Sequence, residues 1–146
     1  MRFRLALTGF LVTVVSAQLG ATSSLQQLSQ LQWKHRILLI QSMPSADSDI
    51  AQLIANQAEI DERHIQWFVL SERGMQTNYV GPMSTQLDDE IATMFSDPTR
   101  EVILMGKDGG IKSRADTFNL ADIFEQIDAM PLRQRESRQQ KAAESQ

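Results

Sequence analysis

The residue types that most often carry chemistry are scarce in this chain. Its 146 residues include no cysteine and two histidines, His35 and His64. Without thiols the chain has no disulfide, no thiolate metal site and no cysteine nucleophile, and two histidines are too few for a His-rich metal site. The available nucleophile–base pairs are Ser42 or Ser45 with His35 or His64, and neither spacing matches the nucleophile elbow of a hydrolase.

Three short motifs resemble ligand-binding patterns but lack an essential part of them. Residues 47–49 have no glycine or distal glutamate of a calcium loop. Gly106 and Lys107 lack the upstream glycine and the following hydroxyl residue of a phosphate-binding loop. Acidic residues 88–90 are expected to form a solvated helix face. We therefore assign no catalytic residue, no metal site and no cofactor from the sequence.

Composition limits the partners. The chain has 14 Lys and Arg against 18 Asp and Glu, a net charge of -4, and 42% of its residues are apolar. These values are typical of one globular domain with a sizeable core. A nucleic-acid surface needs clustered Lys and Arg facing phosphates, so the acidic balance argues against a nucleic-acid partner.

The first segment has the pattern of a secretory signal peptide over residues 1–17. Arg2 and Arg4 precede an apolar run over residues 5–15, and Ala17 follows as a small residue at the exit. The run is too short to span a bilayer as a helix. We expect cleavage, no membrane span afterwards, and export to a bacterial periplasm or secretion.

The rest of the chain alternates between strand and helix patterns. Short apolar or alternating runs predict strands, and apolar residues repeated every three or four positions predict helices. The expected strands cover residues 36–40, 65–70, 101–105 and 111–115, and the expected helices lie around residues 50–58, 85–95 and 120–130. The order is β-α-β-α-β-β-α, which is that of a single thioredoxin-like α/β domain. A small flavodoxin-like sheet is less compatible with the hairpin at residues 107–110.

Three segments together resemble the bacterial branch of the DUDES family, a thioredoxin-like domain of unknown function. They are residues 31–40 (LQWKHRILLI), 104–112 (LMGKDGGIK) and 127–136 (IDAMPLRQRE). The resemblance covers about residues 31–138 and implies a thioredoxin-like fold and a secreted context. It implies no reaction. We therefore divide the mature chain into a leader (18–30), a thioredoxin-like domain (31–131) and a polar, partly disordered tail (132–146).

The expected topology brings three loops to one edge of the sheet. The ends of the first two strands and the start of the third meet there, and ligands of open α/β sheets favour such edges. Residues 42–47, 73–83 and 98–100 should therefore converge. The residues that we expect to contact a ligand or partner are Ser42, Met43, Pro44, Ser45, Asp47, Arg73, Pro98, Thr99 and Arg100.

Several other side chains are expected to serve packing or local structure. Pro98 resembles the cis proline of thioredoxin-like folds, but its distance from Val102 leaves its isomer open. Met75 and Met83 are expected to pack in loops, with an adaptable apolar cleft as the alternative. Both tryptophans, Trp33 and Trp67, are expected in the core or on a sheet face. His64 is expected as a cation at a helix end.

Three functions are compatible with these residues. The first is an exported, non-catalytic domain that binds an unknown protein or small molecule at the loop edge. The second is a hydrolytic or antioxidant-type enzyme that works without cysteine. The third is a structural module that self-associates through the edge strand carrying Lys112 and Arg114. Thiol oxidoreductase activity is excluded in every case.

Overall fold

Five strands form one mixed sheet in the computed structural model, which describes residues 23–146. The strand order is β3-β2-β1-β4-β5. β1 and β2 are parallel, whereas the other neighbouring pairs are antiparallel. The strands are β1 (Arg36–Ser42), β2 (Ile65–Ser71), β3 (Gly74–Thr77), β4 (Arg100–Met105) and β5 (Ile111–Ala115).

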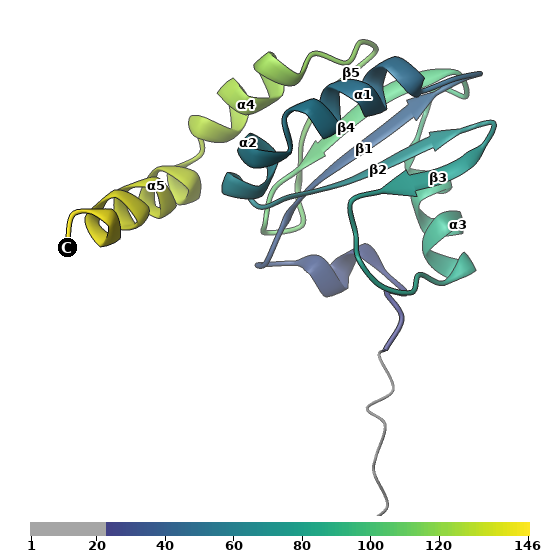
Figure 1. Cartoon of the computed structure of the whole chain (residues 1–146). Helices are drawn as coiled ribbons and strands as arrows, with labels where there is room; N and C mark the ends of the chain where they lie inside the picture. Colours follow the sequence, from purple (N-terminus) through teal and green to yellow (C-terminus); the bar gives the residue numbers. More distant parts are fainter. Residues whose placement is uncertain (1–22) are drawn as a thin grey trace, which may run out of the picture.

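Helices cover both faces of the sheet (Figure 1). α1, α2 and α4 lie on one face, and α3 with the 3-10 helix η1 lies on the other. Their bounds are η1 (Leu28–Leu31), α1 (Asp47–Ala55), α2 (Gln57–Glu62), α3 (Thr85–Met94), α4 (Leu120–Asp128) and α5 (Pro131–Glu144). The sheet is therefore the middle of three layers, and two apolar clusters fill the spaces between them.

The alternation of side chains along β1 divides the core between these clusters. Leu38 and Ile40 face α1, α2 and α4, while Ile37 and Leu39 face α3 and η1. All four are at most 2% exposed. A continuous apolar run is what a strand buried on both faces requires, so the prediction from residues 36–40 is confirmed.

The predicted elements are present, with two local differences. The first predicted helix is divided into α1 and α2 at Asn56, whose side-chain Nδ2 donates to the carbonyl of Gln52 at 2.8 Å. Such a side-chain bond competes with the helical pattern. The loop predicted after β2 contains a strand, β3, because Gly74 takes a φ of +95° and turns the chain back against Ser71.

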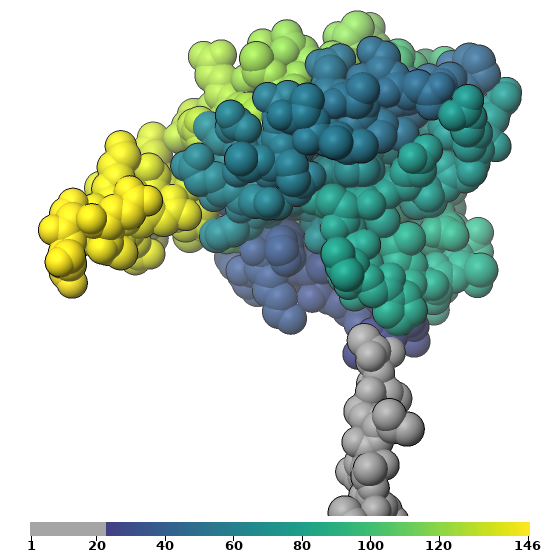
Figure 2. Space-filling model, in the orientation of Figure 1, coloured from purple at the N-terminus to yellow at the C-terminus, as the bar shows by residue number. Residues whose placement is uncertain are grey.

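The segment expected to be a partly disordered tail is the helix α5. Pro131 occupies its first turn, where its missing N–H is no loss. The helix has little apolar surface, but its Arg133 is 4% exposed. Figure 2 shows that the end of α5 projects beyond the body of the domain. The sequence pattern did not predict this helix because α5 docks through charged side chains, which leave no apolar periodicity.

The predicted signal peptide lies outside the described residues. Within residues 23–146, no helix is both long enough and apolar enough to cross a membrane.

Two neighbouring residues of α1 provide a test of this packing. Leu53 is fully buried, whereas the adjacent apolar residue Ile54 is 62% exposed. We predict that Leu53→Ala lowers the free energy of unfolding by about 2–5 kcal/mol. Ile54→Ala is the matched control and should change it by no more than about 0.5 kcal/mol. Urea unfolding of both variants measures the difference, and equal losses would contradict this placement of α1.

Candidate functional site

The loop edge, defined as Ser42–Asp47, Arg73 and Pro98–Arg100, is joined by backbone hydrogen bonds. The Met43 N–H donates to the Thr99 carbonyl at 2.8 Å. The Glu72 N–H donates to the Pro44 carbonyl at 3.3 Å. The chain after β1 is thus tied to the segment before β4 and to the segment after β2. This convergence was predicted from the strand directions.

Most polar side chains at the loop edge are already paired with one another. Arg100 Nη1 donates to Ser42 Oγ at 2.8 Å, and Nη2 lies 3.3 Å from both carboxylate oxygens of Asp49. Arg73 Nη1 donates to Asp47 Oδ1 at 2.9 Å. Neither arginine therefore presents an unneutralised charge to a small anion. The edge is a set of paired charges on an exposed surface.

One expectation about this edge needs correction, and the structure also gives the isomer of Pro98, which the sequence left open. Of the segment 73–83, Arg73 alone belongs to the edge, because β3 carries the following residues back along β2. Met75 and Met83 accordingly pack against the apolar cluster on the α3 face. The cis peptide bond of the described chain is Met43–Pro44, and the bond before Pro98 is trans.

The proposed serine–histidine pairs are not brought together. Ser42 ends β1 and His35 precedes its first residue, so the length of the strand, roughly 20 Å, separates them. His64 lies at the His35 end as well, since the Arg36 N–H donates to the His64 carbonyl. Within residues 23–146, no group of three or more His, Asp or Glu side chains is placed to hold a metal ion.

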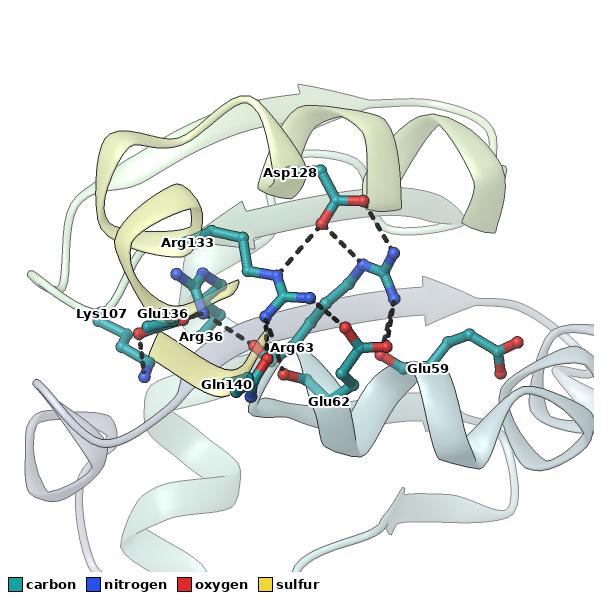
Figure 3. Close-up of polar contacts among 9 residues, drawn as sticks. All are labelled: Arg36, Glu59, Glu62, Arg63, Lys107, Asp128, Arg133, Glu136 and Gln140. Carbon is teal, nitrogen blue, oxygen red and sulfur yellow. Dashed lines mark hydrogen bonds and ion pairs between the residues drawn. The ribbon is translucent and has the colours of Figure 1, made fainter. Parts of the chain in front are cut away.

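The opposite end of the sheet contains two buried cations paired with a half-buried carboxylate, here called the Glu136 cluster (Figure 3). Glu136 Oε2 lies 3.0 Å from Arg36 Nη1, and its Oε1 lies 2.6 Å from Lys107 Nζ. Arg36 is 1% exposed and Lys107 8%. The cluster joins the start of β1, the segment after β4 and α5, three parts of the chain that are far apart in sequence.

A second group of ion pairs fixes α5 to α2 and α4. Arg133 Nη2 lies 2.5 Å from Glu62 Oε1, and its Nε lies 3.3 Å from Asp128 Oδ1. Asp128 also accepts from Arg63 at 2.8 Å, and the Arg63 guanidinium stacks 4.5 Å from the centre of the Phe124 ring. The first two turns of α5 are therefore held by contacts to three other elements.

A comparison with known protein families also includes the docked part of α5 in the domain. A family model described as "Domain of unknown function (DUF4174)" matches residues 27–136. The chain belongs to this DUF4174 family. The match runs from η1 into the docked part of α5 and includes Arg133 and Glu136. No curated protein matches the chain.

The charges of the Glu136 cluster are set by its surroundings. Burial raises the pKa of the Glu136 carboxyl, but the hydrogen bond from Lys107 and the charge of Arg36 outweigh it and hold that pKa below its ordinary value. Burial and the neighbouring Lys107 lower the pKa of His64. The uncharged His64 Nδ1 accepts from Lys107 Nζ at 2.8 Å. The expectation of a cationic His64 was therefore wrong, because a positive charge on the imidazole would be repelled by the adjacent Lys107.

A pocket of about 510 Å³ lies beside this cluster in the DUF4174 domain. Its apolar side chains are Trp33, Met130, Pro131 and Leu132, and its charged side chains are Arg36, Lys107, Asp108, Lys112 and Arg135. Trp67 is 4% exposed, as predicted, but Trp33 is 67% exposed and not in the core. The sequence contained one signal for this site: Trp33 and three of the basic lining residues, Arg36, Lys107 and Lys112, fall within the segments 31–40 and 104–112.

These groups give the domain a defined pH dependence. His35 and His64 have pKa values lowered below 6.5 in the folded state, so the unfolded chain binds more protons as the pH falls below that value. Glu136, whose folded pKa is lowered below 4.5, adds a second loss at lower pH. We predict that the free energy of unfolding falls between pH 7 and 5, and falls further as Glu136 is protonated.

His64→Asn isolates one contribution to this pH dependence. His64 has a φ of +52°, which asparagine tolerates, and asparagine does not titrate. Urea unfolding of this variant should show a smaller loss of stability between pH 7 and 5 than that of the parent. An unchanged slope would show that His64 does not contribute.

Proposed function

We propose that this DUF4174 protein is an exported, non-catalytic binding domain on a thioredoxin-like scaffold, with the loop edge as its contact surface. The order β2-β1-β4-β5, with parallel β1 and β2 and antiparallel β4 and β5, supports the thioredoxin-like assignment. β3 is an additional edge strand beyond that core. The proposed export rests on the signal pattern of residues 1–17.

The observation that carries this proposal is a rigid surface at the position where thioredoxin-like enzymes hold their thiols. That position lies after the first strand, at the start of the first helix. Here it is Ser42–Asp47, which bonds through its backbone to the neighbouring segments. The chain has no cysteine, so the surface is unsuited to thiol redox chemistry but remains pre-organised for contact.

The charges at this surface favour a protein partner over a small anion. The Arg73 and Asp47 side chains of the exposed ion pair are 69% and 61% exposed. An exposed ion pair contributes little to stability, so exchanging it for pairs with a partner costs little. Pro44, Ser45, Pro98 and Thr99 are also exposed, and they supply an area of contact around the two charges.

Site-specific photo-crosslinking tests the proposal. A benzophenone amino acid replaces Ser45 or Thr99, which lie on different loops of the edge, or Gln139 on α5 as the control. We predict that the first two positions give the same discrete adduct in the exporting cell and that Gln139 does not. Adding Arg73→Glu should abolish that adduct. No adduct from either loop in folded protein, or one adduct from all three positions, would contradict a contact surface at this edge.

A further inference from the structure

The pocket beside the Glu136 cluster combines an apolar wall with an excess of positive charge. Four cationic side chains and two carboxylates, Asp108 and Glu136, line it or pair with its lining residues. The excess of two positive charges contrasts with the net charge of -4 of the whole chain. We propose that this pocket binds a small organic carboxylate with an apolar body. The inference is independent of the loop edge, which lies at the other end of the sheet.

Arg36 supplies the group that would recognise the carboxylate. Its Nη1 donates to the Arg63 carbonyl at 2.9 Å and to Glu136 at 3.0 Å. Its Nε and Nη2 are buried and have no hydrogen-bond partner among residues 23–146. Figure 3 shows Arg36 joined to Glu136, with its other nitrogens outside the ion pairs drawn.

The two unpartnered nitrogens are the ones suited to a carboxylate. Nε–H and an Nη–H along one edge of a guanidinium form two parallel hydrogen bonds with the two oxygens of such a group. A buried donor without a partner destabilises the folded state. A ligand carboxylate that enters the pocket, of which Arg36 is a lining residue, supplies both missing bonds once the lining side chains move aside from these buried nitrogens.

Trp33 supplies an apolar surface for the rest of the ligand. The residue has a φ of +65°, and its side chain is exposed. A bulky residue is strained in this conformation, and a side chain this exposed compensates little of that strain by packing. The Trp33 N–H donates to the Lys107 carbonyl at 2.6 Å, which fixes the turn at the pocket. The backbone of Trp33 is thereby fixed beside the pocket, and its indole lines the pocket where the apolar body of a ligand can stack on it.

The dimensions agree with an organic ligand in place of an inorganic ion. About 510 Å³ is within the range of small-molecule pockets, which is roughly 300–1,000 Å³. An inorganic anion would use the Arg36 edge but would leave Trp33 and Leu132 without a contact. A phosphate monoester presents similar oxygens, and the experiment therefore compares the two head groups.

The test uses octanoate, octyl phosphate and octanol as probes for the full domain. NMR resolves the indole N–H of exposed Trp33 from that of buried Trp67. We predict that octanoate shifts the Trp33 signal in a saturable manner, that octanol binds at least about tenfold more weakly, and that octyl phosphate is also weaker. Equal affinities for octanoate and octanol would overturn the anion site, and tighter binding of octyl phosphate would overturn the carboxylate assignment.

Variants connect the binding to the named side chains. Arg36→Lys keeps the charge but removes the paired donors, and should weaken octanoate binding at least about tenfold. Because Arg36 is buried, Trp33→Ala and Arg135→Gln provide surface variants that should also weaken binding without unfolding the domain. Arg138→Gln is the control, since it lies on the same helix outside this pocket. Unchanged affinity in Trp33→Ala and Arg135→Gln would overturn the proposal.

Discussion

The carboxylate of Glu136 lies between two buried cations, Arg36 and Lys107. The position of α5 against the start of β1 and the segment after β4 depends on this contact. Removing the charges of Arg36 and Lys107 from water is costly, and their attraction to the half-buried Glu136 compensates only if the geometry is good. The 2.6 Å and 3.0 Å contacts satisfy that condition. The contact therefore fixes the start of β1, the segment after β4 and α5 relative to one another. The pocket beside the Glu136 cluster is formed where these three parts meet.

The two edges of the sheet differ in how their polar groups are satisfied. At the loop edge, backbone bonds tie the segments, and Arg73 and Arg100 have partners of their own. At the edge with the Glu136 cluster, two nitrogens of Arg36 have no partner within the described part of the chain, and a bulky tryptophan is exposed at a positive φ. The first edge is suited to contact with another surface, whereas the second is suited to a ligand that completes it.

The sequence predicted the parts of the fold that depend on apolar pattern. Four of the five strands and the helices against them follow from periodicity, and the convergence of the loop edge follows from strand direction. α5 escaped prediction because it docks through Arg133 and Glu136, and charged residues usually indicate a solvated face. The pocket escaped because a positive φ at Trp33 cannot be inferred from residue type.

A double-mutant cycle between Glu136 and Lys107 tests most directly whether this shared carboxylate holds α5. Urea unfolding is measured for Glu136→Gln, Lys107→Met and the double variant. We predict that Glu136→Gln alone costs about 3–5 kcal/mol, because it leaves two buried cations without their anion. The double variant should be more stable than the sum of the single losses implies, by at least about 1 kcal/mol. A loss below about 0.5 kcal/mol for Glu136→Gln, with additive effects, would contradict the central role of Glu136.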